Sequence, residues 1–138
     1  MVCIYCGNLT KVVNSRLQRR SNNIWRRRLC VVCAAPFTTQ EKADLFSSFM
    51  VAEESGALRP FLKEKLFLSI YDSCRHRAKA ISDAIALTDT VVTALSFPHQ
   101  QSISPKDIAK VAFEVLNRFD SDAATFYKAY HIKTQTTS

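Results

Sequence analysis

Two C-x-x-C pairs constrain the fold of this chain more than any other feature. The first pair is Cys3 and Cys6, the second is Cys30 and Cys33, and 23 residues separate the two pairs. Each pair can direct two thiolates at one ion, and together they complete the tetrahedral shell of four sulfurs that structural zinc prefers. The spacing predicts one structural Zn²⁺ in a zinc ribbon. All four positions are cysteine, which argues against a catalytic metal with an open position.

The cysteines are expected to be reduced rather than paired in disulfides. The first residues lack the basic and apolar regions of a signal peptide, and no run of about 18 apolar residues suggests a transmembrane helix. In a reducing compartment, paired cysteines serve as metal ligands. A thioredoxin-like redox site is disfavoured because no βαβ pattern surrounds either pair. We therefore expect a cytoplasmic protein with no membrane partner.

The segment between and just after the two pairs is expected to form a three-stranded antiparallel sheet. Residues 11–16 and 24–29 have the composition of strands, a turn at 21–23 separates them, and 36–39 supplies a third strand. So short a segment buries too little apolar surface to fold alone. Zinc is expected to contribute on the order of 10 kcal/mol at neutral pH, so that chelation unfolds residues 1–42 and spares the rest.

Positive charge is concentrated in this first segment. The 138-residue chain has a formal net charge of +7, and six of these charges arise within the first 45 residues. This positive charge is greater than a four-thiolate cluster needs for charge balance. It indicates a polyanionic partner such as double-stranded DNA. The alternative is a solvated basic face without a partner. Trp25 either stacks on a base or packs in the ribbon core. Six arginines are the expected DNA contacts: Arg16, Arg19, Arg20, Arg26, Arg27 and Arg28.

The composition changes at residue 45, and the rest of the chain predicts a hairpin followed by four helices. The hairpin comprises 46–52 and 57–59, with Gly56 free to adopt a positive φ at the turn. Helices are expected over about 61–77 and 80–95. Ser104, Pro105 and Asp107 predict the start of a third helix, and a short fourth helix follows Asp120. The overall class is therefore α+β.

The apolar spacing also predicts which helical faces are buried. The sets expected to face the core are Leu62, Leu66, Ile70 and Cys74; Ile81, Ile85, Val92 and Leu95; Ile108, Val111, Val115 and Phe119; and Phe126 with Tyr130.

No catalytic grouping is apparent in the sequence. His76, His99 and His131 are dispersed and have no neighbours that suggest a triad or a second metal site. A phosphate-binding loop of the Walker type is also missing. We therefore expect that the protein is not an enzyme.

The order of the two modules resembles NrdR-type transcriptional repressors, in which a zinc ribbon precedes an ATP-cone domain. The resemblance spans almost the whole chain and is most specific in the ribbon. It depends on these stretches: Cys3 to Gly7, Asn14 to Arg16, Ile24 to Cys30, Phe37 to Glu41, Gly56 to Phe61, Glu64 to Leu66, Phe119 with Asp120, and Phe126 to Tyr130. It implies domains at 1–44 (ribbon, DNA-binding) and 45–133 (cone, regulatory and oligomerising), with a polar tail at 134–138.

The resemblance further implies a repressor of ribonucleotide reductase genes. Such proteins sense ATP or dATP in the cone, change their homo-oligomeric state and bind paired promoter boxes. Nucleotide contacts are expected at Arg59, Lys63 and Lys65. The family's basic pair before the hairpin turn is replaced here by Glu53 and Glu54, two carboxylates that would repel a triphosphate. Nucleotide affinity is therefore expected to be weakened, altered in specificity or lost.

Two other functions remain open at this point. One is a zinc-ribbon protein that binds RNA or accompanies a polymerase. The other is an interaction protein in which the cone serves only as an oligomerisation scaffold.

Overall fold

The computed structural model describes residues 1–96 and 102–131. The chain divides into two compact units, residues 1–44 and the part that begins at residue 45. Three sequence-based expectations lie outside the described residues: the polar tail at 134–138, the end of the second domain at 133, and His99.

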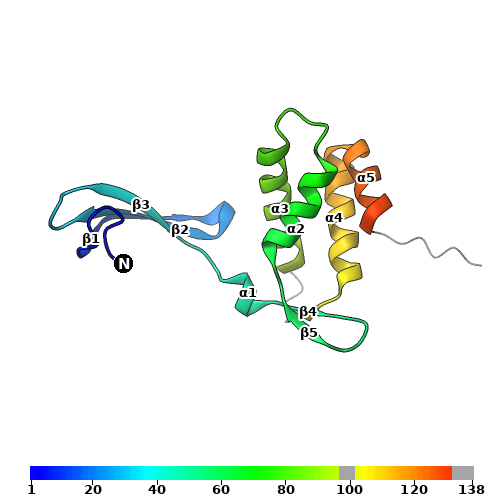
Figure 1. Cartoon of the computed structure of the whole chain (residues 1–138), viewed down its shortest axis with the longest axis horizontal. Coiled ribbons are helices and arrows are strands. Elements are labelled where there is room, and N and C mark those ends of the chain that lie inside the picture. Colours follow the sequence, from blue (N-terminus) through cyan, green and yellow to red (C-terminus); the bar gives the residue numbers. More distant parts are fainter. Residues whose placement is uncertain (97–101, 132–138) are drawn as a thin grey trace, which may run out of the picture. The chain divides into compact units, whose positions relative to one another are not determined.

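The first unit is a three-stranded antiparallel sheet, as predicted from the sequence (Figure 1). The central strand β2 (Asn23–Cys30) pairs with β1 (Thr10–Gln18) and with β3 (Pro36–Glu41). A 3₁₀ turn, η1 (Arg19–Ser21), connects β1 to β2 and ends at Asn22, whose φ is 45°. The register between β1 and β2 shifts between Val12 and Asn14, which marks a β-bulge.

The ribbon has a very small apolar core. Its buried cluster consists of Cys3, Cys30 and Phe37. Apolar residues beside the cysteines stay outside this cluster; Val31 and Val32 are 58% and 67% exposed. Because so little apolar surface is buried, the sheet depends on the cysteine cluster for its stability.

The second unit opens with α1 (Leu45–Ser48) and a hairpin of β4 (Met50–Ala52) and β5 (Leu58–Pro60). The predicted hairpin is present, and Gly56 has the expected positive φ of 82°. The expectation that its first strand begins at 46 is wrong, because 45–48 form a helical turn closed by the Phe49 amide and the Leu45 carbonyl. Leu45 and Phe49 both pack against the core, and residues four apart lie on the same side of a helix. A third strand, β6 (Ser102–Ile103), pairs parallel to β4.

Four helices complete this unit, with the hairpin at one end of them (Figure 1). They are α2 (Lys63–Ser73), α3 (Ala80–Ser96), α4 (Pro105–Phe119) and α5 (Ser121–His131). The predicted start of α4 is confirmed: the Ser104 hydroxyl accepts a hydrogen bond from the Asp107 amide (3.1 Å), and Pro105 is the first helical residue.

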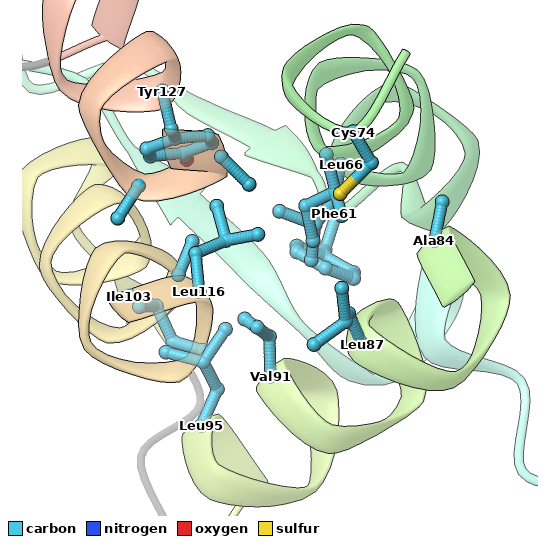
Figure 2. Packing of buried hydrophobic residues seen from close by; sticks show 14 residues of the cluster. Phe61, Leu66, Cys74, Ala84, Leu87, Val91, Leu95, Ile103, Leu116 and Tyr127 are labelled. Carbon is cyan, nitrogen blue, oxygen red and sulfur yellow. The ribbon is translucent and has the colours of Figure 1, made fainter. Parts of the chain in front are cut away.

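The helices surround one apolar core, in which Phe61, Leu66, Val91 and Leu116 point toward one another (Figure 2). Several small residues are fully buried where helices approach closely: Ala84, Ala112, Ala123 and Ala124. Cys74 is 0% exposed and fills the core, as expected.

Part of the predicted burial pattern is wrong. Six large apolar residues expected in the core are substantially exposed: Leu62, Ile81, Ile85, Phe119, Phe126 and Tyr130. On α3 the buried face carries the predicted Leu95 together with Ala84, Leu87, Thr88 and Val91, which were not predicted. On α5, Ala123, Ala124 and Tyr127 are buried in place of Phe126 and Tyr130. Alanine allows close approach of two helices, so the contact face is not the face with the largest apolar side chains.

Within residues 1–96 and 102–131, no helix combines the length and the apolar character needed to cross a membrane.

Candidate metal centre and nucleic-acid interface

The four predicted cysteine ligands come together at one end of the ribbon. Every pair of their sulfurs lies within 4.8 Å. Cys6 Sγ is 3.5 Å from both Cys30 Sγ and Cys33 Sγ, and Cys3 Sγ is 3.7 Å from Cys33 Sγ. A tetrahedral zinc ion with bonds of about 2.3 Å spaces its sulfurs about 3.8 Å apart. The four thiols therefore have the separation that a zinc ribbon site requires.

Each C-x-x-C pair is held by a turn that directs backbone amides at sulfur. The Tyr5 amide donates to Cys3 Sγ, and the amides of Val32 and Cys33 donate to Cys30 Sγ, all at 3.4 Å. The residue after each pair has a left-handed backbone, with φ of 72° at Gly7 and 54° at Ala34. These amides stabilise thiolate charge, so both turns favour the form of cysteine that binds metal.

The electrostatics of the cluster also favour a bound cation. The Asn8 side chain donates to Cys6 Sγ at 3.5 Å and is the main reason why the pKa of Cys6 is lowered to about 6. The Ala35 amide lowers the pKa of Cys33, but the neighbouring Cys30 and Cys6 sulfurs outweigh it and raise that pKa to about 12. Four adjacent thiolates cannot all form without a compensating ion, and four soft sulfur donors are a shell that zinc fills.

The six predicted DNA-binding arginines do not form one surface. Directly paired residues in an antiparallel sheet lie on the same face, and neighbours along a strand alternate between faces. Arg26 pairs with Ser15 and Thr39, whereas Arg27 pairs with Asn14 and Thr38. Arg26 and Arg28 therefore lie on one face of the ribbon and Arg27 on the other.

Arg26 and Arg28 are engaged within the protein. Arg26 Nη2 lies 2.9 Å from Glu41 Oε2, and its Nε donates to the same oxygen at 3.3 Å. Arg28 Nε donates to the Thr39 hydroxyl at 3.2 Å. Phe37, which belongs to the buried cluster, pairs with Arg28 and so shares this face. The guanidinium groups on this face connect the strands to one another.

The opposite face of the three strands carries cations and no carboxylate, and we call it the acid-free face. Arg16 pairs with Trp25, and Trp25 with Gln40. Trp25 is partly exposed and lies on the other face from Phe37, so it is not part of the buried ribbon cluster. The acid-free face is formed by Lys11, Asn14, Arg16, Gln18, Asn23, Trp25, Arg27, Leu29, Pro36, Thr38 and Gln40.

Two further predicted contacts, Arg19 and Arg20, lie in η1 at the tip of the β1–β2 hairpin and are exposed. Lys11, Asn14 and Gln18 were not predicted as DNA contacts. Alternation along β1 would have placed Asn14 and Gln18 beside Arg16, whereas Lys11 joins this face only through the bulge between Val12 and Asn14.

The second unit contains a cavity of about 530 Å³ between the β4–β5 hairpin and helices α2, α4 and α5. Two of the three predicted nucleotide contacts, Arg59 and Lys65, line it. Lys63 does not; its ammonium group forms an ion pair with Asp89 of α3. Tyr127 and Ser69 also line the cavity, and the sequence analysis predicted neither as a ligand contact. Tyr127 lies in the stretch 126–130 that resembles the family, whereas Ser69 belongs to no recognisable motif.

The two carboxylates before the hairpin turn have different surroundings. Glu53 lines the cavity and forms a 2.9 Å ion pair with Arg59. Glu54 is not among the lining residues, and its carboxylate lies 2.8 Å from the Lys106 ammonium group on α4. Only one of the two acidic positions therefore affects the charge of the cavity directly.

The comparisons with known proteins agree on one family. The family model for the N-terminal domain of NrdR-like transcriptional repressors matches residues 1–41. The chain is 32% identical over 124 residues to the transcriptional repressor NrdR of Desulforapulum autotrophicum, an alignment that covers 89% of this chain and 74% of that protein. For NrdR of Ehrlichia canis the identity is also 32%, with 89% and 80% covered.

The match to NrdR of Pelobacter propionicus extends further along both chains, with 30% identity over 135 residues that cover 94% of this chain and 89% of the relative. The similarity thus includes both units and the four cysteines. The chain belongs to the family of NrdR transcriptional repressors.

Proposed function

We propose that this protein is a zinc-dependent, DNA-binding repressor of ribonucleotide reductase genes that binds promoter boxes through the acid-free face of its ribbon. The observation that carries the proposal is the separation of arginines by face. Arg26 is paired with Glu41, whereas Arg16, Arg27 and Lys11 lie together on a face without a carboxylate. The family to which the chain belongs supports the regulatory role. The proposed role is binding rather than catalysis.

The acid-free face suits a phosphate backbone. Arg16 and Lys11 are exposed on β1, and Arg19 and Arg20 extend the same positive charge to the hairpin tip. Guanidinium groups bind phosphate in a bidentate manner, and every neutralised phosphate releases counterions. Trp25 and Gln40, which pair across β2 and β3, provide a flat ring and an amide that can contact base edges.

One ribbon offers little surface for base recognition, so we propose that paired copies occupy paired boxes. A homo-oligomer that works on promoters acts in the cytoplasm at the nucleoid. In this proposal the second unit mediates assembly and responds to a ligand of the adenine nucleotide class bound in its cavity.

The proposal is tested by fluorescence anisotropy with a labelled duplex from the organism's own ribonucleotide reductase promoter. The unaltered protein is expected to bind with a slope of log K against log salt near −3.6 if about four phosphates are neutralised, a loss of on the order of a hundredfold between 50 and 200 mM salt. The double variant Arg16→Ala/Arg27→Ala is expected to reduce this slope by about 2 and the affinity at 50 mM salt by more than about tenfold.

The matched control is Arg26→Ala, which removes an arginine next to Arg27 in the sequence but on the other face. It is expected to keep the salt slope nearly unchanged, since Arg26 already faces Glu41. Zinc content is measured for each variant to exclude loss of the ribbon. If Arg26→Ala abolishes binding and the Arg16→Ala/Arg27→Ala protein binds normally, the assignment of the acid-free face is wrong.

A further inference from the structure

The cavity in the second unit has the dimensions of a small-molecule site. Its volume of about 530 Å³ lies within the range of roughly 300 to 1,000 Å³ that is usual for ligand pockets. It lies between a hairpin and three helices, all within one compact unit, so a bound ligand would contact several elements at once. Such a ligand would influence how these elements pack against one another.

Most of the cavity wall is apolar. Phe61 and Tyr127 are 5% and 3% exposed, and Figure 2 shows both rings in the packed interior of the unit. Val51, Leu66 and Ile108 add aliphatic surface. Ser69 contributes a hydroxyl group. A flat heteroaromatic ring fits a wall of this composition, because its faces bury apolar area while its edge can use a few polar groups.

Two of the three charged groups that line the cavity cancel one another, and one cation remains. Glu53 and Arg59 form an ion pair across the hairpin, with side-chain exposures of 35% and 71%. Arg59 is thus already paired with Glu53, which is the less exposed member of the pair. Lys65 adds one cation, while Lys63 is directed to Asp89 outside the cavity. The lining therefore combines one carboxylate, two cations, of which Arg59 is already paired, and the imidazole of His131.

A triphosphate does not fit this arrangement well. It needs several converging cations, and here a carboxylate occupies the position before the hairpin turn and also competes for Arg59. Bringing several phosphate charges close to Glu53 costs repulsion that an uncharged ligand avoids.

We propose that the cavity binds an uncharged purine nucleoside in preference to a nucleoside triphosphate, and that Glu53 sets this preference. The inference rests on the proposed function for the adenine base of the ligand, and it replaces the charged nucleotide of that proposal by an uncharged nucleoside. Glu53 acts through its charge on the hairpin side of the cavity, while the apolar wall around Phe61 and Tyr127 receives the ring. Replacing Glu53 by a cation should restore triphosphate binding without changing nucleoside binding.

The test is calorimetric titration of the full-length, zinc-loaded protein with adenosine, ATP and dATP, with and without Mg²⁺, at physiological ionic strength. The unaltered protein is expected to bind adenosine more tightly than either triphosphate under both conditions. Glu53→Lys is expected to strengthen ATP binding by about tenfold or more and to change adenosine binding by less than about twofold. Glu53→Gln keeps the side-chain size and should strengthen ATP binding by a smaller factor. This variant tests the inference if Glu53→Lys does not fold.

The control is Glu54→Lys, an adjacent charge reversal outside the cavity. Its effect on ATP binding should be below about threefold, because Glu54 does not line the cavity and its carboxylate is paired with Lys106. The inference is overturned if ATP binds the unaltered protein as tightly as adenosine, with or without Mg²⁺, if neither ligand binds, or if Glu53→Lys does not strengthen ATP binding. Promoter binding is measured in parallel: if it persists in any of these cases, the DNA-binding role in the proposed function stands although the inference fails.

Discussion

Gly7 and Ala34 occupy equivalent positions, each directly after the second cysteine of its pair, and both have a left-handed backbone. Glycine adopts this conformation without strain, whereas alanine does so at a cost of roughly 1 kcal/mol. A Cβ added at Gly7 would meet no atom within 4 Å, so a substitution there changes only the backbone energy. The two turns are thus a natural pair for testing how local strain affects the metal site.

We predict opposite effects of exchanging these residues. Gly7→Ala is expected to destabilise the ribbon by about 1 kcal/mol and Ala34→Gly to stabilise it by up to about 1 kcal/mol. Because ribbon folding is coupled to zinc binding, the apparent zinc affinity should fall about fivefold in the first variant and rise two- to fivefold in the second. Competition with a chromophoric chelator measures both.

Ala35→Gly is the control for the second substitution. Ala35 follows Ala34 and does not have a positive φ, so glycine there relieves no strain and only increases the freedom of the unfolded chain. Its zinc affinity should stay the same or fall slightly. If Ala34→Gly weakened zinc binding as much as Ala35→Gly, strain at Ala34 would not be the cause.

At the level of single residues, the sequence predicted the metal centre better than the basic surface. The C-x-x-C spacing names its four ligands directly, because the chemistry of zinc requires those atoms together. The arginines carry no such requirement. Which of them share a face depends on the register of β2 with its neighbours. The bulge between Val12 and Asn14 in addition moves Lys11 onto the acid-free face. A bulge of this kind has no clear signal in one sequence.

The helical elements show where apolar spacing stops being informative. The start of α4 was predicted to the residue because Ser104, Pro105 and Asp107 each have a local reason to be there. The faces of α3 and α5 were predicted wrongly because close helix packing selects Ala84 and Ala123 over larger neighbours. Strand β6 is two residues long and pairs with β4 across a long stretch of sequence, so it has no periodicity to detect.

The junction between α4 and α5 is secured by Asp120. Its Oδ1 accepts hydrogen bonds from the amides of Asp122 and Ala123 (3.0 and 3.1 Å), which caps α5. Its Oδ2 accepts from Arg77 Nη1 at 2.5 Å and lies 3.3 Å from His76 Nε2. One carboxylate thus connects the α2–α3 loop to the last helix pair.

These contacts predict an acid-sensitive element. The Ala123 amide first, and the Arg77 guanidinium next, hold the pKa of Asp120 well below its ordinary value of 3.8. The unfolded chain therefore takes up this proton before the folded chain does. The stabilisation is complete above about pH 4 and is lost as the pH falls toward the folded-state pKa. Urea midpoints measured from pH 7 to pH 2 should decline below pH 4.

Asp120→Asn should lower the urea midpoint at pH 7 and make this acid decline shallower. The control Asp122→Asn alters a neighbouring carboxylate that makes neither contact of Asp120 Oδ2, and it should keep the acid decline of the unaltered protein. Identical pH profiles for Asp120→Asn and the unaltered protein would show that Asp120 does not connect these elements.

At the scale of the whole molecule, the two units depend on different sources of stability. Among its described residues the second unit has a buried cluster of 14, whereas the ribbon's apolar cluster consists of Cys3, Cys30 and Phe37. Apolar burial can hold the former, but the latter needs the free energy of zinc binding, on the order of 10 kcal/mol. Removing zinc should therefore unfold the ribbon and leave the helical unit intact.

The central claim is that a zinc-held ribbon makes the contact with DNA, and the most direct test is to measure promoter affinity while zinc is removed and then restored. Chelation is expected to abolish specific binding while helical circular dichroism persists, because the folded ribbon holds Arg16 and Arg27 on one face. Affinity should return in proportion to added zinc and saturate at one ion per chain. A zinc-free protein that binds the promoter as tightly as the zinc-loaded protein would contradict this account.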